Sequence, residues 1–392
     1  MLLRCVLIIL NLRQYRVIAK ILHPSLFTLH FFTIFAEPLF NAPNYMTNRT
    51  KTPLAGYTLA GLQQVAAQAG LPRFTATQLA QWIYGRRATG FEVMNNISKA
   101  GRQHLAELYS TGLYSPSGGQ QSADGTVKYL FPTTGGLAVE SVYIPEADRA
   151  TLCISSQKGC KMNCSFCMTG RQGFHGNLTA NEIINQVLSI PESATLTNVV
   201  FMGMGEPMDN IGPVLDAIEI MTAPWGLAWS PKRITVSSIG KMPELSRLIE
   251  QTSVHIAISV HSPFHDERAS LMPVEKAFGV SDVMKTLRGY DFAHQRRLSV
   301  EYIMWEGIND DLRHAKALAK LIAGTNARVN LIRFHAIPGS PLRSSGEQNM
   351  AAFRDFLNSH GTTCTIRRSR GEDIFAACGM LAGDVRKAPQ GA

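Results

Sequence analysis

Three cysteines stand on one short loop, where Cys160, Cys164 and Cys167 follow the spacing C-x3-C-x2-C. This spacing brings three thiolates within reach of a single inorganic centre. Zinc sites and most iron–sulfur sites use four protein ligands, usually in paired C-x2-C steps. Three ligands without a fourth cysteine nearby leave one iron of a [4Fe–4S] cluster open to a substrate. We predict such a cluster; the alternatives are a zinc site completed by a distant histidine and three unligated thiols.

A second reactive centre is predicted at Cys378, which follows the arginine-rich stretch 367–370. Arginines stabilise a thiolate and attract phosphate, and the small neighbours Ala377 and Gly379 leave the sulfur accessible. The alternative is a buried, inert cysteine on a helix.

A carboxylate on a glycine turn is the third feature, in Gly205-Glu206-Pro207 after a predicted strand. Glycine lets the backbone approach a ligand closely, and Glu206 can accept hydrogen bonds from an ammonium group. Taken alone, the motif is an ordinary turn. It gains weight because it follows the cysteine loop by about one β–α unit.

Composition limits the protein classes that fit. The chain of 392 residues is 45% hydrophobic and 17% charged, which is typical of a globular protein with a large core. Its net charge of +9 suits a polyanionic partner, although many basic chains bind none. Seven cysteines, three of them on one loop, do not resemble a secreted disulfide framework. They favour a reducing cytoplasm, where an oxygen-sensitive cluster survives.

Residues 1–45 differ from the rest and predict either an over-long start or a disordered extension. The apolar run Leu26–Ala36 is far shorter than the roughly 20 residues of a membrane helix. A signal peptide fits poorly, because this run comes late and no clear cleavage site follows.

The next segments predict accessory structure. Residues 46–114 have helical periodicity and are predicted to form a small helical domain. Its basic residues either contact RNA phosphates or make a solvated face. They are Arg86, Arg87, Lys99 and Arg102. Residues 115–149 are predicted to be a Gly/Ser-rich linker (115–125) and a β-hairpin, with strands at Val127–Pro132 and Leu137–Ile144. Glu140 lies on the second strand; alone, it would be an exposed carboxylate. Residues 383–392 predict a disordered tail.

Residues 150–382 alternate between strands and helices, which favours parallel strands with right-handed crossovers. Six strands are predicted, fewer than a closed barrel needs, so the fold class is α/β with a partial (β/α)6 TIM-like barrel: Leu152–Ser156, Asn198–Met202, Arg233–Ser237, Val254–Val260, Ser299–Met304 and Arg328–Phe334. Active sites of such folds collect at the carboxyl ends of the strands. The polar residues named here fall at those ends.

From about residue 57 to residue 381 the chain resembles the RlmN/Cfr family of radical S-adenosylmethionine (SAM) RNA methyltransferases, and in particular its adenine-C2 enzymes. Besides the cysteine loop, the resemblance rests on these motifs: Tyr143-Ile144-Pro145, Cys153–Gln157, Gln172-Gly173-Phe174, Asn177-Leu178-Thr179, Met202–Pro207, Glu301-Tyr302, Gly307–Asp310, Pro338–Pro341, Arg370–Asp373 and Ala376–Gly379.

The resemblance implies a radical SAM barrel in which the open iron binds SAM, with Phe166 beside the adenine. The SAM contacts that it implies are Gly205, Glu206, Ser237, Ser259, Val260, His261 and His335. Singly, Ser237, Ser259 and His261 would be satisfied strand-end residues. The family commonly has Asn where His335 stands, which puts the geometry of the contact between His335 and SAM in question. It also commonly has Ser where Ile239 stands.

The resemblance also implies a relay that uses two SAM molecules per turnover. Cys378 takes a methyl group from the first SAM, and a deoxyadenosyl radical from the second removes a hydrogen from that methyl. The methylene radical adds to adenine C2, Glu140 accepts the C2 proton, and Cys153 frees the product by a transient disulfide with Cys378. Cys364 and Cys5 correspond to no motif and are predicted to be inert.

The implied partners are 23S rRNA near the peptidyl-transferase centre, tRNA beside the anticodon, and an electron donor such as flavodoxin or ferredoxin, with no membrane. Three rival functions stay open. They are methylation of adenine C8 by the same mechanism, a radical SAM reaction on a protein or small molecule, and a non-catalytic iron–sulfur RNA-binding factor.

Overall fold

A computed structural model of the chain describes residues 51–294 and 296–383. The predicted extension at 1–45, Cys5 and residues 384–392 of the predicted tail lie outside these residues. Gly383 is described, and it is buried. Within the described ranges no helix is both long and apolar enough to cross a bilayer.

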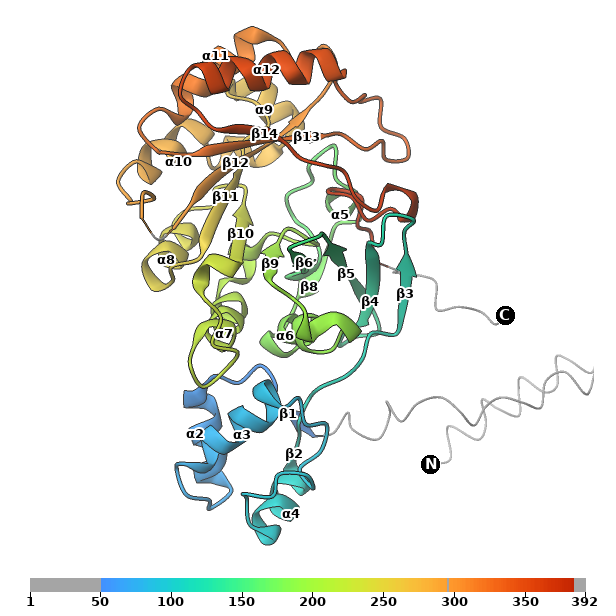
Figure 1. The fold of residues 1–392 in the computed structure, drawn as a ribbon, viewed down its shortest axis with the longest axis vertical. Coiled ribbons are helices and arrows are strands. Elements are labelled where there is room, and N and C mark those ends of the chain that lie inside the picture. Colours follow the sequence, from blue (N-terminus) through green and yellow to red (C-terminus); the bar gives the residue numbers. More distant parts are fainter. Residues whose placement is uncertain (1–50, 295, 384–392) are drawn as a thin grey trace, which may run out of the picture. The chain divides into compact units, whose positions relative to one another are not determined.

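The largest element of the described chain is one mixed sheet, drawn in Figure 1. Seven neighbouring strands in it are parallel and follow the order of the sequence: β6 (Ala150–Cys153), β9 (Asn198–Phe201), β10 (Ile234–Ser238), β11 (His255–Ser259), β12 (Leu298–Met304), β13 (Arg328–Arg333) and β14 (Cys364–Ile366). The six predicted strands are thus present, and β14 adds a seventh. The predicted α/β fold class is confirmed.

The predicted β-hairpin is continuous with this sheet. Its strands β4 (Val127–Pro132) and β5 (Ala138–Pro145) pair with each other, and β5 pairs antiparallel with β6. The prediction of a linker over 115–125 is wrong for β3 (Gly118–Gln121), which pairs with β4. All four residues of β3 are exposed, so this edge strand lacks the apolar alternation by which strands are recognised.

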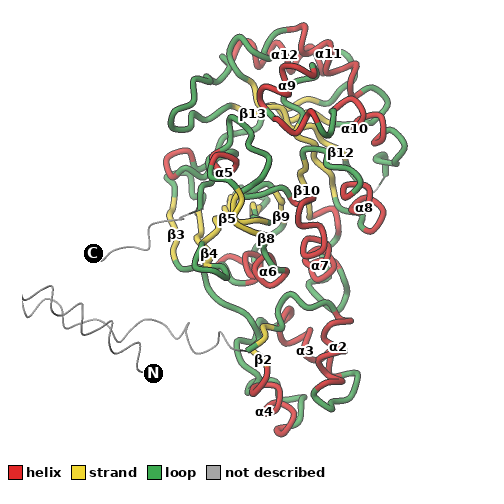
Figure 2. Tube along the Cα trace, turned by 180° about the vertical axis from the view of Figure 1, so that it is seen from behind, coloured by secondary structure: helices red, strands yellow, loops and turns green. Residues whose placement is uncertain are grey.

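Helices follow the parallel strands and lie along the outer side of the curved sheet, as Figure 2 shows from behind. They are α6 (Ala180–Leu188), α7 (Ile211–Thr222), α8 (Glu244–Gln251), α9 (His265–Leu271), α10 (Val280–Leu287), α11 (Leu312–Ile322) and α12 (Glu347–Ser359). The four-residue α5 (Met168–Arg171) directly follows the cysteine loop instead. Local sequence sets several starts: Thr179 and Glu182 form a capping box at α6, and Asp311 caps α11. β12 is buried along its whole length, as expected of a strand covered on both faces.

The helical region before the sheet contains α2 (Leu59–Gln68), α3 (Thr75–Ala80) and α4 (Lys99–Leu108). α3 continues into a π-helical turn at Gln81–Gly85, and the short strands β1 (Thr52–Pro53) and β2 (Tyr109–Ser110) pair in parallel. Asn181 of α6 donates to the carbonyls of Ala55 and Gly112 at 2.8 and 2.9 Å, which ties this region to the barrel. Its RNA-binding role stays a prediction.

Two apolar clusters form the core. The larger lies between the sheet and its helices. The smaller lies beside the cysteine loop, and its buried members are Cys164, Phe166, Ile239, Leu271, Met272, Ile303, Trp305, Ile332, Phe334, Ile337, Ala377 and Met380. Because Ala377 and Met380 flank Cys378, this second cluster anchors the loop that carries that cysteine.

Candidate active site

A cavity opens at the carboxyl ends of the parallel strands, as the order of the sheet predicts. Residues on or just after β9, β10, β11, β12, β13 and β14 line it together with the cysteine loop. The predicted site residues that line it are Cys160, Cys164, Cys167, Gly205, Glu206, Ser237, Ser259, His261 and Cys378. Four others, Glu140, Cys153, Val260 and His335, do not.

The shape of the cysteine loop is set by the short strands on either side, β7 (Gln157–Gly159) and β8 (Phe174–Asn177). Gly159 has φ +78°, and a Cβ atom there would come within 1.9 Å of the Gly173 carbonyl oxygen. That carbonyl instead accepts from the Cys160 amide at 2.9 Å. The glycine therefore allows the close backbone approach that starts the loop.

The three thiols fit an iron–sulfur cluster better than a zinc ion. Within residues 51–294 and 296–383 no three His, Cys, Asp or Glu side chains gather closely enough to hold a single metal ion. A cluster needs no such gathering, because each thiolate binds a different iron. Burial raises the pKa of Cys160 to about 12 and also raises the pKa values of Cys164 and Cys167. Such thiols ionise when a metal binds them.

Cys378 lies beside this loop although it is more than 200 residues away in sequence. The Met168 amide, next to Cys167, donates to the Gly379 carbonyl at 2.8 Å. The Thr169 hydroxyl donates to the Leu381 carbonyl at 2.6 Å. The Cys378 side chain is exposed at the cavity, so the prediction of a buried, inert cysteine on a helix is excluded for this position.

Cys153 ends β6 and is buried, and burial together with the nearby Cys378 raises its pKa to about 12. Arg367 interacts electrostatically with both cysteines. Burial disfavours the charged form of Arg367, but Cys378, Glu301 and Cys153 favour it more, so the pKa of Arg367 is raised. Its guanidinium lies 3.4 Å from a Glu301 carboxylate oxygen. Both cysteines are free thiols here, and their disulfide stays a prediction.

Glu206 is held in place by backbone donors. Its carboxylate accepts from the amides of Met208 and Ile239, each at 3.1 Å. Its own amide donates to Gln157 at 2.9 Å. Burial raises the pKa of Glu206 to about 7, although the nearby hydrogen bonds oppose this shift. Because Ile239 contributes its amide, the unusual residue at that position does not weaken the hold on Glu206.

His261 is presented to the cavity in one tautomer. Its Nδ1 accepts from the Ile303 amide at 3.0 Å, so Nε2 carries the proton. Burial, helped by Arg268, lowers the pKa of His261 to about 3, which keeps the ring neutral. Its ring packs edge-on against Phe166 with 5.0 Å between centroids. The site therefore offers a neutral N–H donor.

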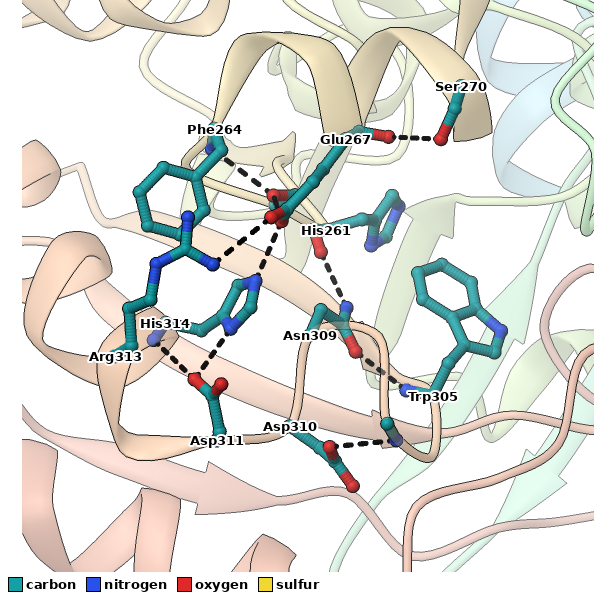
Figure 3. Close-up of polar contacts among 12 residues, drawn as sticks. His261, Phe264, Glu267, Ser270, Trp305, Asn309, Asp310, Asp311, Arg313 and His314 are labelled. Atoms are coloured by element: carbon teal, nitrogen blue, oxygen red, sulfur yellow. Dashed lines mark hydrogen bonds and ion pairs between the residues drawn. The ribbon is translucent and has the colours of Figure 1, made fainter.

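Asn309 fixes the loop that carries His261, as Figure 3 shows. Its side-chain nitrogen donates to the carbonyls of His261 at 2.6 Å and Ile303 at 2.7 Å, and its oxygen accepts from the Trp305 amide at 2.7 Å. The same view shows His314 held between Glu267 and Asp311, with 2.7 Å to each carboxylate. These contacts tie α9 to the start of α11.

Replacing Asn309 by alanine is expected to lower the free energy of unfolding by about 3 kcal/mol, because buried backbone groups left unpaired cost about 1–3 kcal/mol each. Urea denaturation of the full chain measures the change. Asn95→Ala, at an exposed position, is the control and should have little effect. Equal stability of the two variants would contradict the assigned network.

Four predicted site residues do not line the cavity, and each lies elsewhere in the structure. The Val260 side chain is buried in the larger core, and only its backbone is near the site. His335 lies 3.1 Å from the Ser369 hydroxyl and 3.6 Å from Glu372, so it contacts the segment that leads to Cys378. Glu140 and Cys153 lie on β5 and β6, behind the lining.

The sequence analysis gave no role to two residues that shape the site. The buried Arg268 donates to the carbonyls of Ile239, Ser259 and Val260 at 2.9–3.0 Å and pairs with Glu275. It therefore braces the ends of β10 and β11. Gln157 holds the Glu206 amide. The available signal for Arg268 was an acid seven residues later, on the short 3-10 helix Pro273–Lys276 that follows α9.

Known proteins resemble the chain in both regions. Residues 154–321 match the radical SAM superfamily, and residues 52–110 match the N-terminal domain of ribosomal RNA large subunit methyltransferases. A probable dual-specificity RNA methyltransferase RlmN from Porphyromonas gingivalis is 59% identical over 85% of this chain and 94% of its own length. The RlmN from Syntrophobacter fumaroxidans is 40% identical over 84% of this chain and 97% of its own.

A solved structure agrees with these sequence matches. The radical SAM methyltransferase from Sphaerobacter thermophilus superposes with a TM-score of 0.79 at 36% identity, over 84% of this chain and 99% of that one. Identity of this extent shows common descent across the helical region and the barrel. The chain therefore belongs to the RlmN family of dual-specificity RNA methyltransferases, within the radical SAM superfamily.

Proposed function

We propose that this chain methylates C2 of adenine in 23S rRNA, near the peptidyl-transferase centre, and in tRNA, beside the anticodon. The observation that carries the proposal is one cavity lined by both the cysteine trio and Cys378. Adenine C2 is an electron-poor sp2 carbon and cannot attack SAM directly as an amine would. A radical source and a separate methyl carrier in one cavity meet that difficulty.

The residues suited to the cofactors are those that line the cavity. Cys160, Cys164 and Cys167 would ligate a [4Fe–4S] cluster, which with SAM supplies a 5′-deoxyadenosyl radical. Glu206 accepts from the SAM amino group, while the His261 N–H and the hydroxyls of Ser237 and Ser259 donate to its oxygens. We propose two SAM molecules per turnover and an external one-electron donor such as flavodoxin or ferredoxin. Such a cluster and RNA partners favour a cytoplasmic location.

Cys378 carries the carbon in this proposal. Its thiolate attacks the methyl carbon of one SAM and takes the methyl group, and S-adenosylhomocysteine leaves, which is covalent catalysis. Loss of a hydrogen atom from that methyl leaves a methylene radical, which forms a carbon–carbon bond to C2. Glu140 then takes the C2 proton as a general base. Motion is required, because Glu140 does not line the cavity.

Cys153 completes the cycle. Cleavage of the carbon–sulfur bond leaves a thiyl radical on Cys378 and a product carbanion, which takes a proton from solvent. The thiyl bonds to the sulfur of Cys153, which gives up its proton, and the surplus electron passes to an external one-electron acceptor, such as the oxidised electron donor, as the disulfide forms. A reductant must reopen the disulfide before the next turnover. Arg367 lies near both sulfurs, and its charge opposes the rise in the pKa of the Cys153 thiol.

The test is anaerobic reconstitution with SAM, reductant and unmodified rRNA or tRNA, followed by mass spectrometry of the nucleosides. We expect 2-methyladenosine from both RNAs. Finding 8-methyladenosine instead would establish the rival regiochemistry. Formation of deoxyadenosine without any methylated nucleoside would favour a substrate other than RNA, and RNA binding without deoxyadenosine would favour a non-catalytic factor.

A further inference from the structure

The carboxylate of Glu140 has different partners on its two oxygens. Oε1 lies 3.2 Å from the Lys128 ammonium. Oε2 accepts from the backbone amides of Ala382 at 2.9 Å and Gly383 at 3.3 Å. The side chains of Lys128 and Glu140 are only 12% and 11% exposed. Both oxygens of this buried carboxylate therefore already have a donor in this structure.

The partner on Oε1 belongs to the hairpin. β4 and β5 pair so that Leu130 stands opposite Glu140 and Lys128 opposite Val142. Lys128 and Glu140 are therefore diagonal neighbours on one face of the hairpin, within reach of each other for long side chains. Lys128 is the only ion-pair partner of Glu140 in the part of the chain that the structure describes.

The partners on Oε2 belong to the segment that carries Cys378, because Ala382 and Gly383 follow that cysteine by four and five residues. This segment is closely seated: a Cβ atom on Gly383 would lie 2.7 Å from the Ala138 carbonyl oxygen. Leu381, which directly precedes Ala382, lines the cavity, whereas Glu140 does not. Oε2 can therefore meet a substrate in the cavity only after the two amides have left it.

We propose that Lys128 is the positioning residue for the proton-accepting step, and that Oε2 of Glu140 is the oxygen that takes the proton. The inference rests on the proposed function, in which Cys378 moves between a methyl donor, the RNA base and Cys153. When that movement withdraws the amides of Ala382 and Gly383, the Lys128 ammonium still holds Oε1 to the hairpin. The free Oε2 then faces the adduct on Cys378.

The test compares Lys128→Met, Lys128→Arg and Glu140→Gln in the reconstituted holoenzyme with SAM, reductant and tRNA. Loss of a general base costs about 10²–10⁴-fold, so Glu140→Gln should accumulate the covalent RNA–protein adduct. Lys128→Met should slow adduct release by about tenfold, a fraction of that loss, while deoxyadenosine is still formed. Lys128→Arg should restore release, since it keeps a cation near Oε1. Denaturing gels quantify the adduct, and chromatography quantifies deoxyadenosine.

The control is Lys285→Met, which removes an exposed lysine on α10, away from the cavity lining, and should release product normally. If Lys128→Met releases the adduct at the wild-type rate while Glu140→Gln does not, Lys128 has no positioning role. If Lys128→Met also loses deoxyadenosine, or Lys128→Arg fails to restore release, its role is only structural. Normal release by Glu140→Gln would instead overturn the function proposed for Glu140.

Discussion

Replacing Cys378 by alanine is expected to reduce RNA methylation to background while cleavage of SAM continues. The methyl carrier is lost, because alanine has no nucleophilic sulfur. The cysteine trio and the residues around Glu206 lie on other elements, so the cluster and SAM sites persist. Nucleoside mass spectrometry measures 2-methyladenosine, and chromatography of the same reactions measures deoxyadenosine.

Two further variants show whether this separation is specific. Cys160→Ala should lose both products, since two thiolates hold the cluster poorly, and iron analysis should show the loss directly. Cys364→Ala is the matched control: Cys364 is buried on β14, away from the cavity lining, and both products should be kept. Continued methylation by Cys378→Ala would refute the relay.

Replacing Glu206 by glutamine is expected to weaken SAM binding by about 10- to 100-fold, because hydrogen bonds to a charged group contribute about 1.5–3 kcal/mol. The glutamine has one acceptor oxygen, so one of the amides of Met208 and Ile239 would also lose its partner. Equilibrium binding to the anaerobic holoenzyme measures the dissociation constant. A constant equal to that of wild type would exclude Glu206 from the SAM site.

The affinity of wild type for SAM, relative to that of Glu206→Gln, is expected to depend on pH. The pKa of Glu206 is raised to about 7 by burial, so the carboxylate that accepts the ligand's hydrogen bonds is lost as pH falls through that value. The advantage of wild type over Glu206→Gln should fall by about tenfold between pH 8 and pH 6. The amino group of SAM titrates alike for both proteins, so their ratio isolates the carboxylate. A ratio independent of pH would contradict the shift.

The chemistry of the site could be predicted from the sequence because few residue types can perform it. Few inorganic centres are bound by three cysteines on one loop. The Gly205-Glu206 motif indicated a binding site because it follows a predicted strand. Parallel strands then brought these residues to one edge of the sheet. The proximity of Cys378 to Cys167 could not be predicted in this way. It depends on the hydrogen bond between Met168 and Gly379, which leaves no pattern in the local sequence.

The two strands of the mixed sheet that the sequence analysis missed, β3 and β14, lie at its edges. β14 has three residues, too few for a periodic pattern, and it forms by pairing with β13. α12 did carry a signal, since Met350, Phe353 and Leu357 have helical spacing and are its buried residues. His335 could not be placed, because its contacts with Ser369 and Glu372 depend on the segment after β14, whose only described helix or strand is the 3-10 turn Glu372–Ile374.

The position of Cys378 near the end of the chain bears on how the enzyme matures. Chains are synthesised from the amino end, so the residues of strands β6–β13 and the cysteine trio are made before residues 367–383. Those last residues form one wall of the cavity. A chain that ended before residue 367 would keep the three cysteines but lack Cys378, and with it the means to transfer carbon.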